Sequence, residues 1–159
     1  MTGPIFDTHA HYDDEAFDAD REALLASMPE HGVGLILDPG CDLESSRRAV
    51  ELARTYPHIY AAVGWHPENC APYTEGSLDA LRAWAREPKV VAIGEIGLDY
   101  YWEQNPPREL QQRVLRDQLA LAQELDLPVI VHDREAHADS LAIVQEFPAV
   151  RGVFHCFSG

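Results

Sequence analysis

Short apolar runs alternate with helical patterns along the whole chain, and this alternation constrains the fold more than any other feature. Six apolar runs are typical of buried parallel strands, near residues 4–8, 33–37, 59–64, 90–94, 128–131 and 152–155. Five stretches between them have the spacing of amphipathic helices, at about 18–31, 43–56, 77–87, 107–126 and 135–147. A strand–helix repeat of this kind predicts an α/β fold with a parallel sheet.

Two architectures are compatible with this repeat, an open doubly wound sheet and a (β/α)8 barrel of the TIM type. A barrel has two more strands than the six predicted here and usually takes about 250 residues, whereas this chain has 159. The sequence also ends at Gly159, directly after the sixth apolar run, with no helix to cover it. We therefore expect one domain over residues 1–159 and, if the fold is a barrel, a chain truncated after about six of the eight units.

The charge balance limits the partners that such a domain can bind. Twenty-seven acidic residues against twelve Lys and Arg give a net charge of −15, which repels a nucleic-acid backbone or an anionic membrane. A polyanionic substrate would need another attractive group, and a bound metal ion is one candidate.

The sequence also gives an expectation about the compartment. No apolar run reaches the length of a membrane span, and nothing resembles a signal peptide. The three cysteines are odd in number and form no CxxC pair, so no disulfide framework is indicated. We expect a cytoplasmic protein without a membrane partner.

Histidines and one acid come after the predicted strands. The chemistry of parallel α/β folds gathers at the carboxyl ends of the strands, and five of the eight histidines lie at this predicted rim, on four different strands. Together with the acid that succeeds the fourth strand, these residues are His9, His11, His66, Glu95, His132 and His155. Their clustering predicts a metal site.

The pair His9 and His11 is the first indication of a metal site. Positions i and i+2 of a strand share one face, about 7 Å apart along the strand, so both imidazoles can converge on a single ion. Glu95 adds a carboxylate that could bridge two ions, and His132 and His155 could hold the second. The alternative for each residue alone is structural, as a histidine bonded to a nearby loop or a glutamate that caps the next helix.

With these residues identified, the chain resembles the TatD family of metal-dependent deoxyribonucleases, within the amidohydrolase-like barrels. The matching segments occur in family order at Phe6–His11, Gly64–Pro67, Gly94–Tyr101, His132–Ala136 and His155–Gly159. The resemblance implies a (β/α)8 barrel with one or two divalent ions (Mg²⁺, Mn²⁺ or Zn²⁺). It also implies hydrolysis of phosphodiester bonds in DNA, commonly as a 3′-to-5′ exonuclease.

The resemblance also implies roles for individual residues. By position, His9 and His11 would bind one metal, Glu95 would bridge, and His132 and His155 would bind the second.

Other positions would serve the substrate. His66 matches a histidine that lines the family's site, so that Glu95, His66 and Arg134 are the expected catalytic residues. Arg134 would contact a substrate phosphate, and Asp99 would lie behind the ligands or line the pocket. Tyr100 is expected to contact substrate, because the aromatic run Tyr100–Trp102 could stack on bases; the alternative is that the run packs under the loop 99–106.

Two positions depart from the family pattern. After His66-Pro67 the family often has another histidine, whereas this sequence has Glu68-Asn69. Family members also carry a metal-binding aspartate after the eighth strand, which this sequence does not reach. Five of the six expected ligands are therefore present.

Two other functions remain open from the sequence. The first is an amidohydrolase-type barrel acting on a small-molecule amide or ester, many of which use a lysine carbamate at the end of the fourth strand. Here Glu95 occupies that place and Lys89 precedes the strand, which favours the phosphodiesterase. The second is a truncated chain without catalytic activity, whose exposed strand edges would promote association.

Overall fold

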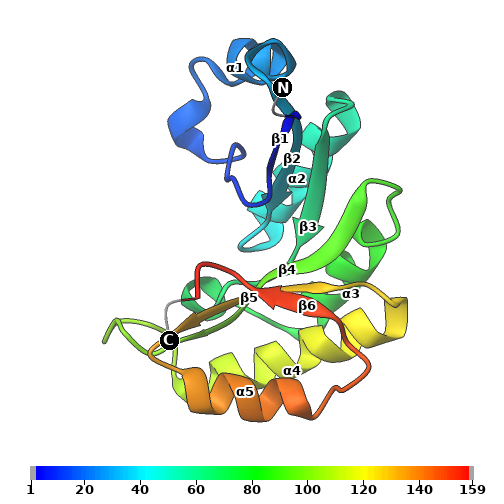
Figure 1. Ribbon diagram of the computed structural model, residues 1–159. Coiled ribbons are helices and arrows are strands. Elements are labelled where there is room, and N and C mark those ends of the chain that lie inside the picture. Colours follow the sequence, from blue (N-terminus) through cyan, green and yellow to red (C-terminus); the bar gives the residue numbers. More distant parts are fainter. Residues whose placement is uncertain (1–2, 158–159) are drawn as a thin grey trace.

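The computed structural model describes residues 3–157 as a six-stranded, all-parallel sheet with helices between the strands (Figure 1). The order of the strands in the sheet is the same as their order in the chain. The strands are β1 (Ile5–Asp7), β2 (Val33–Pro39), β3 (Ile59–Val63), β4 (Val90–Asp99), β5 (Val129–Arg134) and β6 (Gly152–Phe154).

Five α-helices connect these strands within the described residues, and three short 3₁₀ helices accompany them at Glu15–Phe17, Met28–His31 and Pro67–Asn69. The α-helices are α1 (Arg21–Ser27), α2 (Leu43–Thr55), α3 (Glu75–Trp84), α4 (Arg108–Leu125) and α5 (His137–Gln145). Over residues 3–157, no helix combines the length and the apolar character that crossing a membrane requires.

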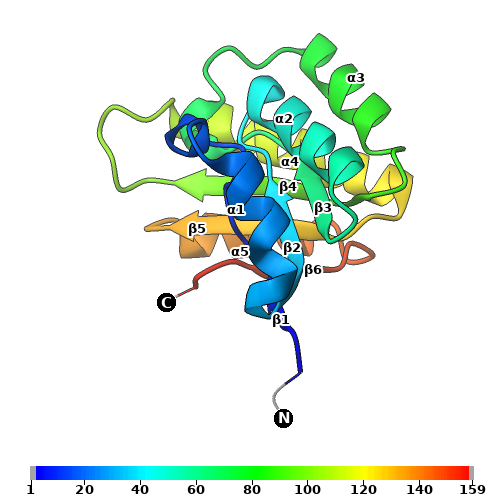
Figure 2. The same cartoon turned by 90° about the horizontal axis from the view of Figure 1, so that it is seen from above.

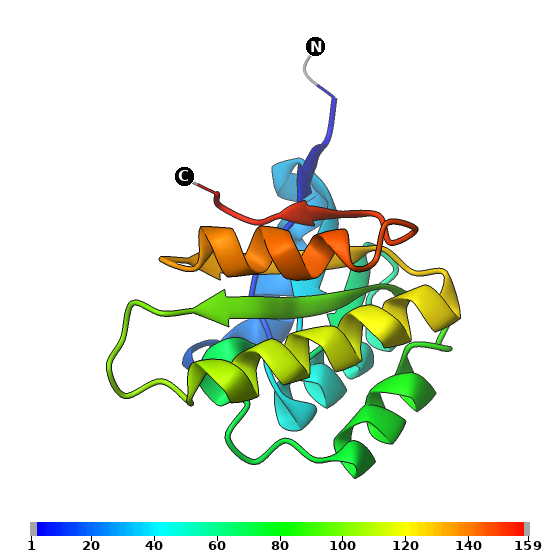
Figure 3. The ribbon, with the colours of Figure 1, turned by 90° about the horizontal axis from the view of Figure 1, so that it is seen from below.

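The sheet curls into half of a barrel. β4 and β5 run across the direction of β1 and β2 (Figure 2), and α3, α4 and α5 lie together on the outer side of the sheet (Figure 3). Consecutive parallel neighbours with intervening helices are the pattern of a (β/α)8 barrel, not of a doubly wound sheet, whose strand order reverses. The predicted α/β fold of the TIM-barrel type is confirmed, with six of its strands described.

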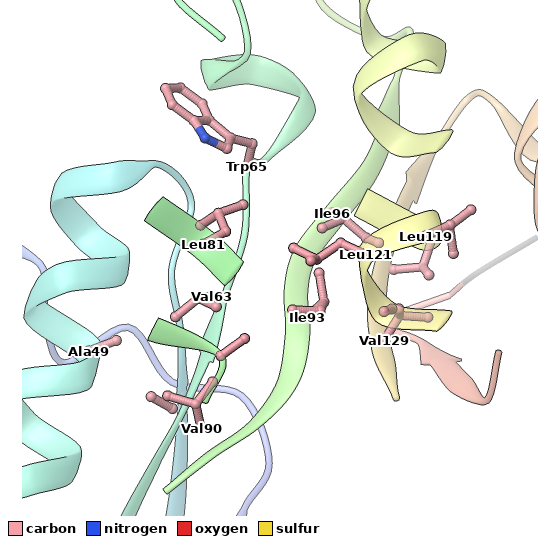
Figure 4. Close-up of a cluster of buried hydrophobic side chains, with 14 of the residues drawn as sticks. Ala49, Val63, Trp65, Leu81, Val90, Ile93, Ile96, Leu119, Leu121 and Val129 are labelled. Carbon is pink, nitrogen blue, oxygen red and sulfur yellow. The ribbon is translucent and has the colours of Figure 1, made fainter. Parts of the chain in front are cut away.

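The main hydrophobic core lies between the outer face of the sheet and the helices (Figure 4). Ile93 and Ile96 of β4 pack there with Leu119 and Leu121 of α4, and all four side chains are buried. Full burial of one such side chain stabilises the fold by roughly 1.5–3 kcal/mol. This packing fixes β4, the strand that carries Glu95 and Asp99, against the longest helix.

A smaller apolar cluster lies on the inner face of the sheet. It consists of one residue from each of the four central strands, Leu37, Ala62, Ala92 and Ile130. On the two edge strands, Phe6 and Val153 are exposed. The inner face is therefore more open than the helix-covered face.

One predicted helix is shorter in the structure. The pattern over 18–31 contains an α-helix only at Arg21–Ser27, and Met28–His31 forms a 3₁₀ helix. Pro29 explains the change, because proline has no N–H to donate and its ring clashes with the preceding turn of an α-helix.

One predicted strand is longer in the structure. The fourth strand, predicted over 90–94, continues to Asp99, so that Glu95 lies inside β4 and not in a loop after it. Gly97 makes this possible: its φ is +146°, and a Cβ there would lie 1.9 Å from the carbonyl oxygen of His132. Only a residue without a side chain lets β5 approach this closely.

Gly97→Ala should therefore destabilise the protein by about 2–4 kcal/mol, because the added methyl group forces β4 and β5 apart. Thermal unfolding followed by circular dichroism measures the effect. Gly76→Ala is the matched control: its new Cβ meets nothing nearer than 3.7 Å, and alanine in a helix is favoured over glycine by about 0.5–1 kcal/mol. An unchanged Tm in Gly97→Ala would contradict the close-approach argument.

Candidate metal centre

A buried carboxylate, Glu95, lies at the centre of the histidine cluster. Its Oε2 is 3.1 Å from Nε2 of His9 and 3.6 Å from Nε2 of His11. Its Oε1 is 3.3 Å from Nδ1 of His132 and 3.9 Å from Nε2 of His66. Each oxygen of Glu95 thus faces a different pair of imidazoles, and the residue is only 4% exposed.

The first pair of histidines is held by the segment after β1. This strand ends at Asp7, so His9 and His11 lie beyond it. The amide of Ala10, between them, donates to the carbonyl of Leu37 on β2 (3.1 Å), which keeps the segment alongside the sheet. The two Nε2 atoms consequently lie 3.1 Å apart.

The spacing of the donor atoms fits divalent metal ions. Two groups, His9/His11/Glu95 and His66/Glu95/His132, each bring three possible ligand atoms within 4.8 Å of one another. In a tetrahedral site with bonds of 2.0–2.1 Å, ligand atoms are about 3.3 Å apart, and those of the first group are separated by 3.1–3.6 Å. Imidazole and carboxylate donors suit Zn²⁺, and carboxylates also suit Mg²⁺ and Mn²⁺.

The charges of the cluster favour an ionised centre. Burial alone raises the pKa of Glu95, but hydrogen bonds with His11, His132 and His9 outweigh it and hold that pKa well below its usual range. The hydrogen bond to Glu95 raises the pKa of His11. Burial, reinforced by His132, lowers the pKa of His66 to about 4. A carboxylate anion is thus surrounded by imidazoles, one of which, His66, is neutral near pH 7.

Asp99 lies behind His132. It is fully buried on β4, and its Oδ2 is 3.0 Å from Nε2 of His132. This contact leaves the other ring nitrogen, Nδ1, directed at Glu95. Two positions were expected for Asp99, behind the ligands or lining the pocket. The geometry favours the position behind the ligands, because the side chain of Asp99 has no exposed surface that could contact a substrate.

Two glutamines that the sequence analysis missed fix the backbone of the site. Gln118 of α4 accepts from the amide of Trp65 (2.7 Å) and donates to its carbonyl (3.1 Å), directly before His66. Gln111 does the same for Asp99, at 2.9 and 3.0 Å. Both glutamines are at most 1% exposed. Their signal in the sequence is two amides seven residues apart on the apolar face of one helix.

His155 does not join either ligand group among the described residues. It comes directly after β6, where its amide donates to the carbonyl of Val131 (2.8 Å). Its ring stacks on that of His9, with centroids 3.5 Å apart. In the group where the sequence predicted His155, the geometry brings His66 beside His132 instead; ligation by His155 stays a prediction.

Arg134 and the neighbouring Tyr101 border the pocket that opens over the cluster. Arg134, Tyr101 and His155 line this pocket with the histidines of the centre. Tyr100, expected to contact substrate, points elsewhere: its hydroxyl donates to Asp139 (2.9 Å), and Arg108 covers its ring at 4.2 Å. Tyr101 takes the place at the pocket that was predicted for Tyr100.

The sequence of this chain matches a known protein family. The family model described as "TatD related DNase" matches residues 6–159, nearly the whole chain. The chain belongs to the TatD family. The last matching segment, His155–Gly159, is described up to Phe157, and Ser158 and Gly159 lie outside the described residues.

Individual members of the family are similar over most of this chain. A Bacillus subtilis protein named "Uncharacterized metal-dependent hydrolase YabD" is 42% identical, and a Salmonella typhimurium protein named "3'-5' ssDNA/RNA exonuclease TatD" is 36% identical, each over 98% of this chain. The crystal structure of the Escherichia coli TatD homologue YjjV has a TM-score of 0.88 at 40% identity over 98% of this chain. The chain spans about three fifths of each of them, 61%, 60% and 61%.

Gln118→Ala should destabilise the protein by about 1–3 kcal/mol, because the buried amide and carbonyl of Trp65 lose their partners. Urea unfolding measures this free energy. Gln123→Ala, on the exposed side of the same helix, should change it by less than about 0.5 kcal/mol. Equal effects of the two substitutions would show that Gln118 does not brace the segment that carries His66.

Proposed function

We propose that the chain carries the metal centre of a divalent-metal-dependent phosphodiesterase that removes nucleotides from the 3′ end of single-stranded DNA. One observation carries the proposal: a single buried carboxylate lies between two groups of histidines, with one oxygen toward each. The name of the Salmonella relative, a 3′-5′ ssDNA/RNA exonuclease, supports the same bond and the same direction.

In this proposal His9, His11 and Glu95 hold one ion, and Glu95 and His132 hold the other with His66 or His155. Ions bound there would lower the pKa of the attacking water and offset negative charge on the phosphate and on the leaving 3′-oxygen. Glu95 would contribute an ionised carboxylate, with one oxygen toward each group of histidines. Asp99 keeps Nδ1 of His132 turned toward Glu95.

Besides metal binding, His66 would act as a hydrogen-bond donor in the proposed reaction. Its Nδ1 accepts from the amide of Glu68 (3.3 Å), so in the neutral ring the proton lies on Nε2, which faces Glu95. With a pKa lowered to about 4 by burial, the ring is a neutral hydrogen-bond donor. His66 can thus donate to a phosphate oxygen, and it would become a metal ligand through Nε2 only if the ring proton moved to Nδ1.

Arg134 supplies a positive charge for the phosphate. No acidic partner of its guanidinium occurs within the described residues, whereas Arg47, Arg54 and Arg82 are held in ion pairs with glutamates. In a chain with a net charge of −15, an unpaired guanidinium beside the centre is a natural contact for a non-bridging oxygen.

Many barrels of the amidohydrolase alternative use a bridging lysine, and this chain does not bring its lysine to the site. Lys89 is the one lysine of the sequence. Its Nζ donates to the carbonyls of Ala53 and Tyr56 at the opposite end of the sheet. In this proposal Glu95 would take the bridging place, which favours phosphodiester hydrolysis over the lysine-carbamate mechanism.

Incubation of the chain with 3′-end-labelled single-stranded DNA and Mg²⁺ or Mn²⁺ tests the function. Release of labelled mononucleotide that stops when EDTA is added is the expected result. Absence of release from chain that has bound metal would support the alternative of a chain without catalytic activity.

Glu95→Gln tests the bridging carboxylate in the same assay. Loss of the negative charge should lower turnover more than about a hundredfold, beyond the 10–100-fold typical of residues behind the ligands. Metal affinity, followed by isothermal titration calorimetry, should fall with it. Glu51→Gln, an exposed acid on α2, is the control and should leave both unchanged. Unaltered turnover in Glu95→Gln would refute the role.

A further inference from the structure

Two large aromatic side chains, Tyr101 and Trp102, are exposed beside the metal centre. They are 50% and 43% exposed, and their rings contact each other edge to face, with centroids 4.6 Å apart. The alternative that the aromatic run packs under the loop 99–106 therefore applies to Tyr100 but not to Tyr101 or Trp102. Exposed aromatic surface at the border of a polar pocket is typical of a binding site.

The cation next to this pair is Arg134. Its guanidinium lies 4.0 Å from the ring centre of Tyr101 and 5.5 Å from that of Trp102. Planar guanidinium groups stack on aromatic faces and also bind phosphate. The three side chains thus join two stacking surfaces to one phosphate-binding group.

The loop that carries the aromatic pair is fixed to the metal centre. Oδ1 of Asp99 accepts from the amide of Tyr101 and from Nδ2 of Asn105, each at 3.0 Å. The amide of Asn105 in turn donates to the carbonyl of Trp102 (3.2 Å). Since the other oxygen of Asp99 contacts His132, one carboxyl group positions both the aromatic pair and a proposed ligand.

The two sides of the site differ in charge. The hollow on the side of His11 is bordered by acids, among them Asp13, Asp14, Asp42 and Glu44, with Arg48 as its basic residue. On the side of Tyr101 the lining holds Arg134 and one exposed acid, Glu135, while Asp133 there is already bonded to His137 (2.9 Å). A phosphodiester strand is repelled more strongly from the first side and meets an aromatic surface and a cation on the second.

We propose that Tyr101, Trp102 and Arg134 form a stacking site for the bases of single-stranded nucleic acid, whose 3′-terminal phosphodiester lies at the metal centre. The inference rests on the proposed function and names how its substrate is held. Stacking needs unpaired bases and tolerates any sequence. With one arginine at phosphate, binding should weaken only slightly with salt, by a slope of about 0.7 in log–log units.

Fluorescence anisotropy of a 5′-labelled oligodeoxynucleotide tests the site without requiring hydrolysis. A normal strand is compared with a strand of equal length and charge whose sugars carry no bases. The chain with Mn²⁺ should bind the normal strand about tenfold more tightly, the contribution of roughly one stacked base. The double variant Tyr101→Ala/Trp102→Ala should abolish this difference, and Tyr101→Phe should keep it.

Leu141→Ala is the matched control, since Leu141 is an equally exposed apolar side chain (54%) on α5, and it should leave the preference intact. Equal binding of the two strands, or a preference that survives in the double variant, would overturn the stacking site. Base-dependent binding without nucleotide release would uphold the stacking site and refute the proposed exonuclease. Hydrolysis of both strands from the 3′ end at equal rates, with equal binding, would uphold the exonuclease and refute the stacking site.

Discussion

The whole site depends on one buried carboxylate. Glu95 is held inside the half-barrel by a strand that packs on the longest helix, and histidines from the segments after β1 and β3 and from β5 face its two oxygens. A buried carboxylate is costly unless it is paired, and here the paired groups are the imidazoles themselves. The same imidazole and carboxylate atoms are donors that divalent cations accept, and they lie close enough together to serve as ligands.

The surroundings of this carboxylate are built to hold the histidines in place. Gln111 and Gln118 bind the backbone at Asp99 and at Trp65 from the same face of α4. Asp99 then contacts His132 with one oxygen and the loop of Tyr101 with the other. The outer helix is thereby linked through hydrogen bonds to His132, to the backbone directly before His66, and to the loop of the aromatic pair.

Much of this could be predicted from the sequence, because apolar runs define parallel strands, and parallel strands bring the residues at their carboxyl ends to one rim. The βα repeat, His9, His11 and Glu95 are of this kind. Periodicity could not reveal that β4 continues through Gly97, since close approach of β5 is a tertiary effect. Periodicity also could not show which of His66 and His155 lies beside His132, or which of Tyr100 and Tyr101 faces the pocket. The directions of these side chains depend on how the segments after the strands fold.

The central proposal, that Glu95 would be shared by two cations, is tested most directly by titrating the chain with Mn²⁺ and following its EPR spectrum. Two ions per chain with an exchange-coupled signal are predicted, because a carboxylate that contacts both ions couples their spins. Two uncoupled ions, a single ion, or no specific binding would contradict the claim.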